Sequence, residues 1–376
     1  MLLNDEDNMI FNNTNNINNT NNPENGYKQF INKETSLSFR GIAAVMVILS
    51  HYAEWYSWFV QSTGNREVFR VALTKLGVYG VDIFFLLSGY AMVKSLGDKK
   101  VNHDFIIKRI RNIYLPYFIV TGVIELISGG FTSLKDFWKF ASGYDYWYMN
   151  VLFVFYIGFI IIYALFKNTP IRVVAFSALT YIYSHTLYKN GMYEFWYVSN
   201  ITFVIGIITA ELEKLIGNKK IDEDKRHIIK IASVINLIMI IILGIGMFFI
   251  VKSGLYGQEA LSSYTIEQQI RFKIGATIVW TLLVLLLAAK WKIKEKIFAF
   301  LGKNSLYLYL THTYIFMRVI NSKVFENISF NIANTALITK FAISAVITIV
   351  VSGLCGFVIS GLTKLLSYRH SNPDHS

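Results

Sequence analysis

The feature that most constrains this chain is a series of apolar segments, each about 20 residues long. A helix of that length crosses the hydrocarbon core of a bilayer, whereas the strands of a membrane barrel are shorter and alternate apolar with polar residues. The predicted segments are 39–60, 76–96, 112–128, 146–166, 170–188, 195–213, 228–251, 271–289, 304–321 and 337–366. The sequence therefore predicts an all-α, polytopic membrane helical bundle with about ten transmembrane helices.

The composition and the distribution of charge agree with this class. Only 16% of the 376 residues are charged, against roughly 25% in soluble domains, and the mean hydropathy is +0.42. The formal charge of +12 does not indicate nucleic-acid binding, because roughly 24 of the 36 Lys and Arg residues fall on the side that would hold both termini. The positive-inside rule predicts that both termini are cytoplasmic, in a multi-pass protein of the cell membrane that contacts membrane lipids.

The chain divides into one membrane domain and two tails. Residues 1–38 are polar and Asn-rich and are predicted to form a disordered cytoplasmic tail. Residues 39–367 form the membrane domain, and 368–376 a short cytoplasmic tail. The loops between segments are too short to fold as a soluble catalytic module, so any chemistry must occur in or beside the membrane. Tyr and Trp near segment ends, as at 144–148, are expected to be interfacial anchors.

The first apolar segment carries an arginine and a histidine eleven residues apart, Arg40 and His51. Eleven residues make about three helical turns, so both side chains lie on one face, about 16 Å apart along the axis. Ionisable groups inside a membrane are costly and usually mark function. The functional interpretation is an anion-binding cation and a proton-transferring imidazole. The alternative is an arginine bound to lipid phosphate and a histidine satisfied by a neighbouring helix.

Three further groups could carry chemistry. The segment 77–90 combines glycines that permit close helix packing with Asp82 and Ser88, and Asp82 either caps the helix or lines a site. Lys108, Arg109 and Arg111 form a basic cluster that is either a topology signal or a phosphate-binding group. His312, taken alone, is more typical of a hydrogen-bonded core histidine than of a catalyst.

Several common sites have no signal in the sequence. No Walker A loop, dinucleotide-binding GxGxxG, CxxC pair, HExxH or GxSxG is present, and no metal site is predicted.

These segments together resemble the acyltransferase-3 family of membrane acyltransferases. Its R-x10-H pair is matched by Arg40 and His51, and its G-V-D-x-F-F-x-x-S-G-[FY] segment by residues 80–90. Its late segment LG-x-x-S-Y-x-L-Y-L-x-H is matched by residues 301–312, except that Leu306 replaces a frequent Tyr. The basic cluster before a proline is also present, with a spacing that differs by one residue.

The resemblance implies an enzyme that moves an acetyl or similar acyl group from cytosolic acyl-CoA to a hydroxyl of a surface or lipid-linked polysaccharide. Arg40, Lys108, Arg109 and Arg111 would then bind the phosphates of acetyl-CoA. The catalytic residues that the resemblance implies are His51, Arg40, Ser88 and His312. His51 would accept a proton or relay the acyl group, and Ser88 would stabilise the oxyanion.

Two other classes of function remain open at the level of sequence. One is a multi-span transporter or flippase of carbohydrate or a small solute, since ionisable groups in the membrane also suit proton coupling. The other is a membrane sensor or scaffold, which would leave the cost of burying Arg40 and His51 unexplained. The sequence also leaves the oligomeric state open, a homodimer included.

Overall fold

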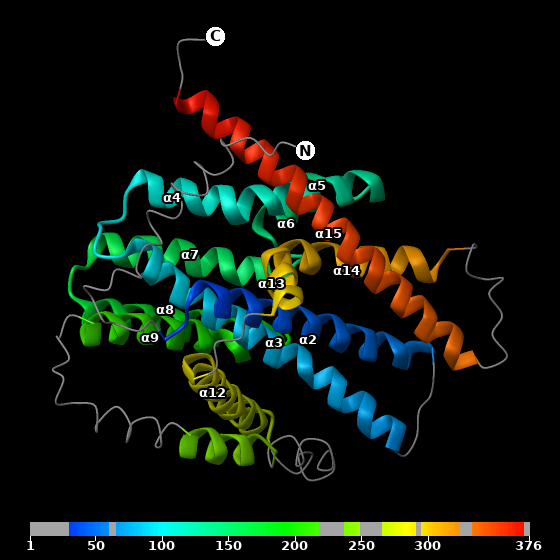
Figure 1. Cartoon of the computed structure of the whole chain (residues 1–376), viewed down its shortest axis with the longest axis horizontal. Coiled ribbons are helices and arrows are strands. Elements are labelled where there is room, and N and C mark those ends of the chain that lie inside the picture. The colour runs from blue at the N-terminus through cyan, green and yellow to red at the C-terminus, as the bar shows by residue number, and fades with distance from the viewer. Residues whose placement is uncertain are drawn as a thin grey trace.

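The computed structural model describes residues 30–59, 65–217, 237–248, 265–290, 295–322 and 333–371. These residues form helices and no strand, so the predicted all-α membrane bundle is confirmed. Most helices run along the long axis of the molecule, and α15 crosses them diagonally (Figure 1). Most of the predicted Asn-rich tail, up to residue 29, lies outside the described residues, as do residues 372–376.

The labelled helices in residues 65–217 are joined by short turns, except that α4, η1 and α5 continue into one another from His103 to Ser128. In chain order the labelled helices are α2 (Lys33–Phe59), α3 (Asn65–Leu96), α4 (His103–Arg109), η1 (Ile110–Tyr114), α5 (Leu115–Ser128), α6 (Leu134–Ser142), α7 (Trp147–Leu165), α8 (Thr169–Lys189), η2 (Glu194–Trp196), η3 (Val198–Asn200), α9 (Ile201–Gly217), α12 (Ile266–Lys290), α13 (Lys296–Lys303), α14 (Ser305–Ile320) and α15 (Ala333–Ser371).

Helix α2 begins at Lys33, before the predicted start at residue 39, because Asn32 caps it. The Oδ1 atom of Asn32 accepts a hydrogen bond from the backbone N–H of Thr35 at 2.8 Å. Such a cap satisfies an amide of the first turn that has no partner within the helix. The helix then continues unbroken to Phe59, so the predicted common helix for Arg40 and His51 is confirmed.

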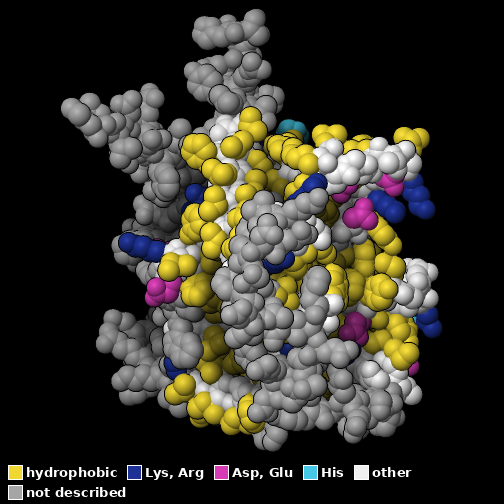
Figure 2. Space-filling model, turned by 90° about the vertical axis from the view of Figure 1, so that its right-hand side faces the viewer, with side chains coloured by type: hydrophobic (Ala, Val, Ile, Leu, Met, Phe, Trp, Pro, Cys, Tyr) yellow, Lys and Arg dark blue, Asp and Glu magenta, His cyan; other side chains and the backbone are white. Residues whose placement is uncertain are grey.

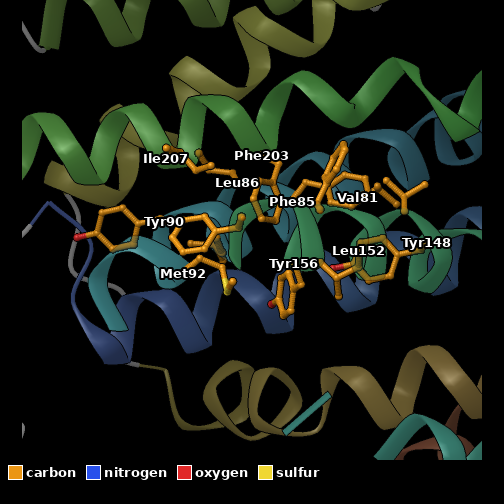
Figure 3. Packing of buried hydrophobic residues seen from close by; sticks show 14 of the residues in the cluster. Val81, Phe85, Leu86, Tyr90, Met92, Tyr148, Leu152, Tyr156, Phe203 and Ile207 are labelled. Carbon is orange, nitrogen blue, oxygen red and sulfur yellow. The ribbon is translucent and has the colours of Figure 1, made fainter. Parts of the chain in front are cut away.

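Helix α3 packs between α2 and α9, and glycines set how closely the backbones approach. A Cβ atom on Gly80 would lie 2.8 Å from the carbonyl oxygen of Ala43 in α2. A Cβ atom on Gly89 would collide with the carbonyl oxygen of Phe203 in α9. Figure 3 shows the Phe203 ring in the core beside Phe85 of α3. The predicted close helix crossing at these glycines is confirmed.

Helix α15 is held to α14 and α2 by a buried stripe of small polar residues, Ser344, Thr348 and Ser352. The Ser344 hydroxyl donates to the Tyr52 hydroxyl of α2 at 2.9 Å. The hydroxyls of Ser352 and Thr311 of α14 lie 3.3 Å apart. Small residues and hydroxyl hydrogen bonds are the usual contacts between helices in a membrane, where lipid removes the hydrophobic driving force.

The opposite face of α15 exposes a run of large apolar side chains, as a lipid-facing surface requires. Val346, Val350, Leu354 and Phe357 each keep more than half of their surface accessible. In Figure 2 hydrophobic side chains cover much of the described surface, and charged side chains are few.

Seven helical segments in the described part of the chain are long and apolar enough to cross a membrane. The predicted count of about ten is therefore not confirmed. Helix α14 has only 16 residues, and α8 carries Arg172 and several polar residues in its length. The predicted span 228–251 is described only at Leu237–Phe248, a shorter apolar helix.

Candidate active site

Two histidines from opposite ends of the chain meet at one place. The ring centroids of His51 in α2 and His312 in α14 lie 5.1 Å apart. The His51 ring also stacks on the ring of Trp55, with the centroids 5.5 Å apart. His51 keeps 34% of its side chain exposed, whereas His312 is 2% exposed. One imidazole is therefore accessible to a substrate, and the second is enclosed beside it.

The hydrogen bonds of His312 define its tautomer. Its Nδ1 atom lies 2.8 Å from the carbonyl oxygen of Tyr309 and 3.1 Å from that of Leu308. A carbonyl oxygen can only accept, so Nδ1 carries the proton and donates. No carboxylate in the described part of the chain pairs with this buried ring. In the neutral ring Nε2 is then an acceptor, with the Thr313 hydroxyl 3.3 Å away.

Two arginines gather at a second place. Arg40 of α2 and Arg109 of α4 interact electrostatically as like charges. The Nε and Nη2 atoms of Arg109 are buried and have no hydrogen-bond partner among the described residues. The Arg109 guanidinium also lies 4.8 Å from the centre of the Phe105 ring. Because no described carboxylate pairs with either arginine, the pair is suited to bind an anion.

The basic cluster does not act as one surface. Lys108 is exposed, and Arg111 lies in η1, a π-helix that comes directly after Arg109. A π-helix inserts one extra residue into a helical turn, so the residues before the insertion are rotated relative to the residues after it. The insertion coincides with the unusual spacing of this cluster in the sequence. Of the three cations, Arg109 is the one whose electrostatic neighbours include Arg40.

Two tyrosines connect the arginines with the histidines. The centroid of the Tyr309 ring lies 6.0 Å from that of His312 and 5.3 Å from that of Tyr148 in α7. Tyr148 in turn interacts with Arg40 and with the hydroxyl of Ser88. Tyr148 was expected to be an interfacial anchor, but it is only 8% exposed. Its proximity to Arg40 depends on how α7 packs, which periodicity within α7 does not reveal.

Ser88 is connected to both places through Tyr148. Its described interaction is with Tyr148, and the rings described in contact with His51 are those of Trp55 and His312. The structure thus places Arg40 near Arg109 and His51 beside His312, and Tyr148 interacts with both Ser88 and Arg40. Lys108 is exposed and interacts with Arg109 only as a neighbouring like charge, and Arg111 has no described interaction with either group.

A comparison of the sequence with protein families identifies the family of this chain. The family model of the acyltransferase-3 type, described as an acyltransferase domain, matches residues 38–357. The chain belongs to the acyltransferase-3 family. Arg40, His51, Ser88, Arg109 and His312 all lie within the matched region of this membrane acyltransferase. Neither a curated protein nor a solved structure matches the chain.

Proposed function

We propose that this membrane acyltransferase moves an acetyl or similar acyl group from acyl-CoA to a hydroxyl of a cell-surface or lipid-linked polysaccharide. The observation that carries the proposal is that α2 places Arg40 near the unpartnered Arg109 of α4 at one position and the accessible His51 at another. A donor that is anionic at one end and reactive at the other would use both.

The arginine site suits the phosphates of the donor. Phosphate oxygens would satisfy the buried Nε and Nη2 atoms of Arg109 and relieve the repulsion from Arg40. The rise from Arg40 to His51 is about 16 Å, so an extended pantetheine arm running along α2 would bring the thioester toward the imidazole. Ser88 enters this proposal through its contact with Tyr148, which also interacts with Arg40.

His51 is the proposed base. The acceptor hydroxyl gives its proton to a ring nitrogen of His51 while its oxygen bonds to the thioester carbonyl carbon. The carbon–sulfur bond breaks, and the leaving thiolate takes the proton, so that CoA and the acyl ester are formed. The buried, neutral His312 packs against the ring of His51. His51 is therefore the member of the pair that a substrate can reach.

The direction of transfer follows from the charge distribution. With both termini cytoplasmic, the end of α2 that carries Arg40 faces the cytosol, where acyl-CoA is made. His51 then lies toward the outer face of the cell membrane, where a surface glycan or a lipid-linked intermediate is reached.

The test uses the purified full chain with acetyl-CoA labelled in the acetyl group. Release of CoA and transfer of label to an envelope glycan fraction are measured for the unchanged protein and for His51→Ala. We expect His51→Ala to lose at least 100-fold in rate while eluting as the same monodisperse species. An unchanged rate would exclude His51 as the base. Absence of CoA turnover, together with glycan passage into proteoliposomes, would favour a transporter instead.

A further inference from the structure

One carboxylate lies beside the proposed base without a role in the function above. Glu54 comes three residues after His51 on α2, so the two side chains share one side of the helix. Its Oε2 atom is 3.8 Å from Nδ1 of His51, and its side chain is 59% exposed. This distance is slightly too long for a hydrogen bond. Catalytic hydrogen bonds are often long before substrate binds and shorten in the complex.

The remaining neighbours of His51 occupy other sides of its ring. Trp55 stacks against it with an interplanar angle of 19°, and His312 is tilted by 31°. The ring nitrogens lie at the edge of the imidazole, where Glu54 approaches Nδ1. Of the titratable groups that the structure describes around His51, Glu54 is the acid and His312 is an enclosed base. Glu54 is therefore the group placed to select the tautomer of His51.

We propose that Glu54 is a positioning residue for His51. Its carboxylate accepts the Nδ1–H proton, which leaves the lone pair of Nε2 free to take the proton of the attacking hydroxyl. When Nε2 has taken that proton, the carboxylate also stabilises the positive imidazolium. The inference rests on the proposed function, because it assigns the orientation of the base in that reaction.

The test separates the hydrogen bond from the charge with two variants. Glu54→Gln keeps an acceptor oxygen and the size of the side chain but removes the charge, and Glu54→Ala removes both. The assay is release of CoA from acetyl-CoA in water, in which water replaces the acceptor hydroxyl, acetate is the product and the thiol is detected. The dependence of kcat and KM on pH is recorded for each protein.

For Glu54→Gln we expect the acidic limb of the kcat profile to move to lower pH, because the imidazolium formed during the reaction has lost its counter-charge. For Glu54→Ala we expect the same shift and a further five- to twenty-fold loss of kcat, because the tautomer is no longer selected. The KM for acetyl-CoA should stay within twofold in both variants, since Glu54 is far from the arginine site.

Glu267→Gln is the matched control, since Glu267 is an exposed glutamate paired with Arg271 along its own helix. It should leave the profile unchanged. If both Glu54 variants turn over acetyl-CoA with the unchanged profile and kcat, the positioning role is wrong while the proposed function stands. If the unchanged protein releases no CoA, the proposed function itself fails. A lower folded fraction with no shift in pH profile would show a structural role only.

Discussion

At the scale of single residues, Arg109 is the cation whose surroundings most clearly require an anion. Two of its nitrogens are buried without a partner in the described part of the chain, while its neighbour Lys108 is exposed. Hydrogen bonds to charged groups contribute about 1.5–3 kcal/mol. We therefore expect Arg109→Ala to raise the KM for acetyl-CoA by about 10- to 100-fold with little change in kcat, measured by CoA release.

Lys108→Ala is the matched control for this prediction, because it removes an exposed cation one residue away. It should change KM less than twofold. Arg109→Lys keeps the charge but not the planar fork, so it should recover only part of the loss. Equal effects of the Arg109 and Lys108 substitutions would mean that the cluster acts by general charge, as in a topology signal.

A second residue, Asp82, is enclosed in the core of the bundle. It is 0% exposed, and neither carboxylate oxygen has a hydrogen-bond partner among the described residues. The hydroxyls of Ser199 and Thr277 are its nearest described polar neighbours, without the geometry of a hydrogen bond. Asp82→Asn replaces the carboxyl with an amide that stays neutral and can both donate to and accept from these hydroxyls, so we expect the free energy of unfolding to rise by about 1–3 kcal/mol.

Thermal unfolding of the detergent-purified protein measures this change, with Asp98→Asn as the control because Asp98 is fully exposed. A lower unfolding temperature for Asp82→Asn would contradict the prediction and indicate that the carboxylate holds a partner that stabilises it.

At the scale of helices, the crossing of α3 and α9 depends on glycine. A Cβ atom on Gly89 would overlap the carbonyl oxygen of Phe203, which is backbone and cannot rotate away. We expect Gly89→Ala to separate the two helices and to cost about 1–3 kcal/mol, seen as a lower unfolding temperature. Gly275→Ala in α12 is the control, since a Cβ there meets nothing within 4 Å and should stabilise its helix by up to about 1 kcal/mol.

Helices are also the level at which sequence patterns are most informative. The apolar run around Arg40 and His51 predicts one unbroken helix, and α2 is one. The π-helix η1 could not be predicted in the same way, because its residues Ile110–Tyr114 have ordinary helical propensities. It is visible in the sequence only as the one-residue difference in the spacing of the basic cluster.

At the scale of the whole molecule, Glu213 of α9 ties the start of the described chain to the bundle. It is 0% exposed and accepts hydrogen bonds from the Tyr90 hydroxyl at 2.5 Å and from Lys94 at 2.8 Å, both in α3. It also accepts one from the backbone N–H of Phe30 at 3.4 Å. The three segments meet at this carboxylate although they are far apart in sequence.

We expect Glu213→Gln to lower the free energy of unfolding by about 2–3 kcal/mol, because it leaves Lys94 without its counter-charge. The value lies below that of a fully buried pair, since 29% of the Lys94 side chain is exposed. Thermal unfolding monitored by intrinsic fluorescence measures it. A change no larger than that of Asp98→Asn, which weakens the exposed contact to Lys214, would contradict a stabilising role for the cluster.

The sequence by itself determined the helical membrane class, the family and the common helix of Arg40 and His51, because hydrophobic length and helical periodicity are local properties of the chain. The tertiary structure decided which groups meet: His51 with His312, Arg40 with Arg109 rather than with Lys108 or Arg111, and Ser88 with Tyr148. These encounters depend on which face each helix turns to its neighbour. That choice is set by glycine contacts, polar stripes and one inserted residue in η1, acting between segments distant in sequence.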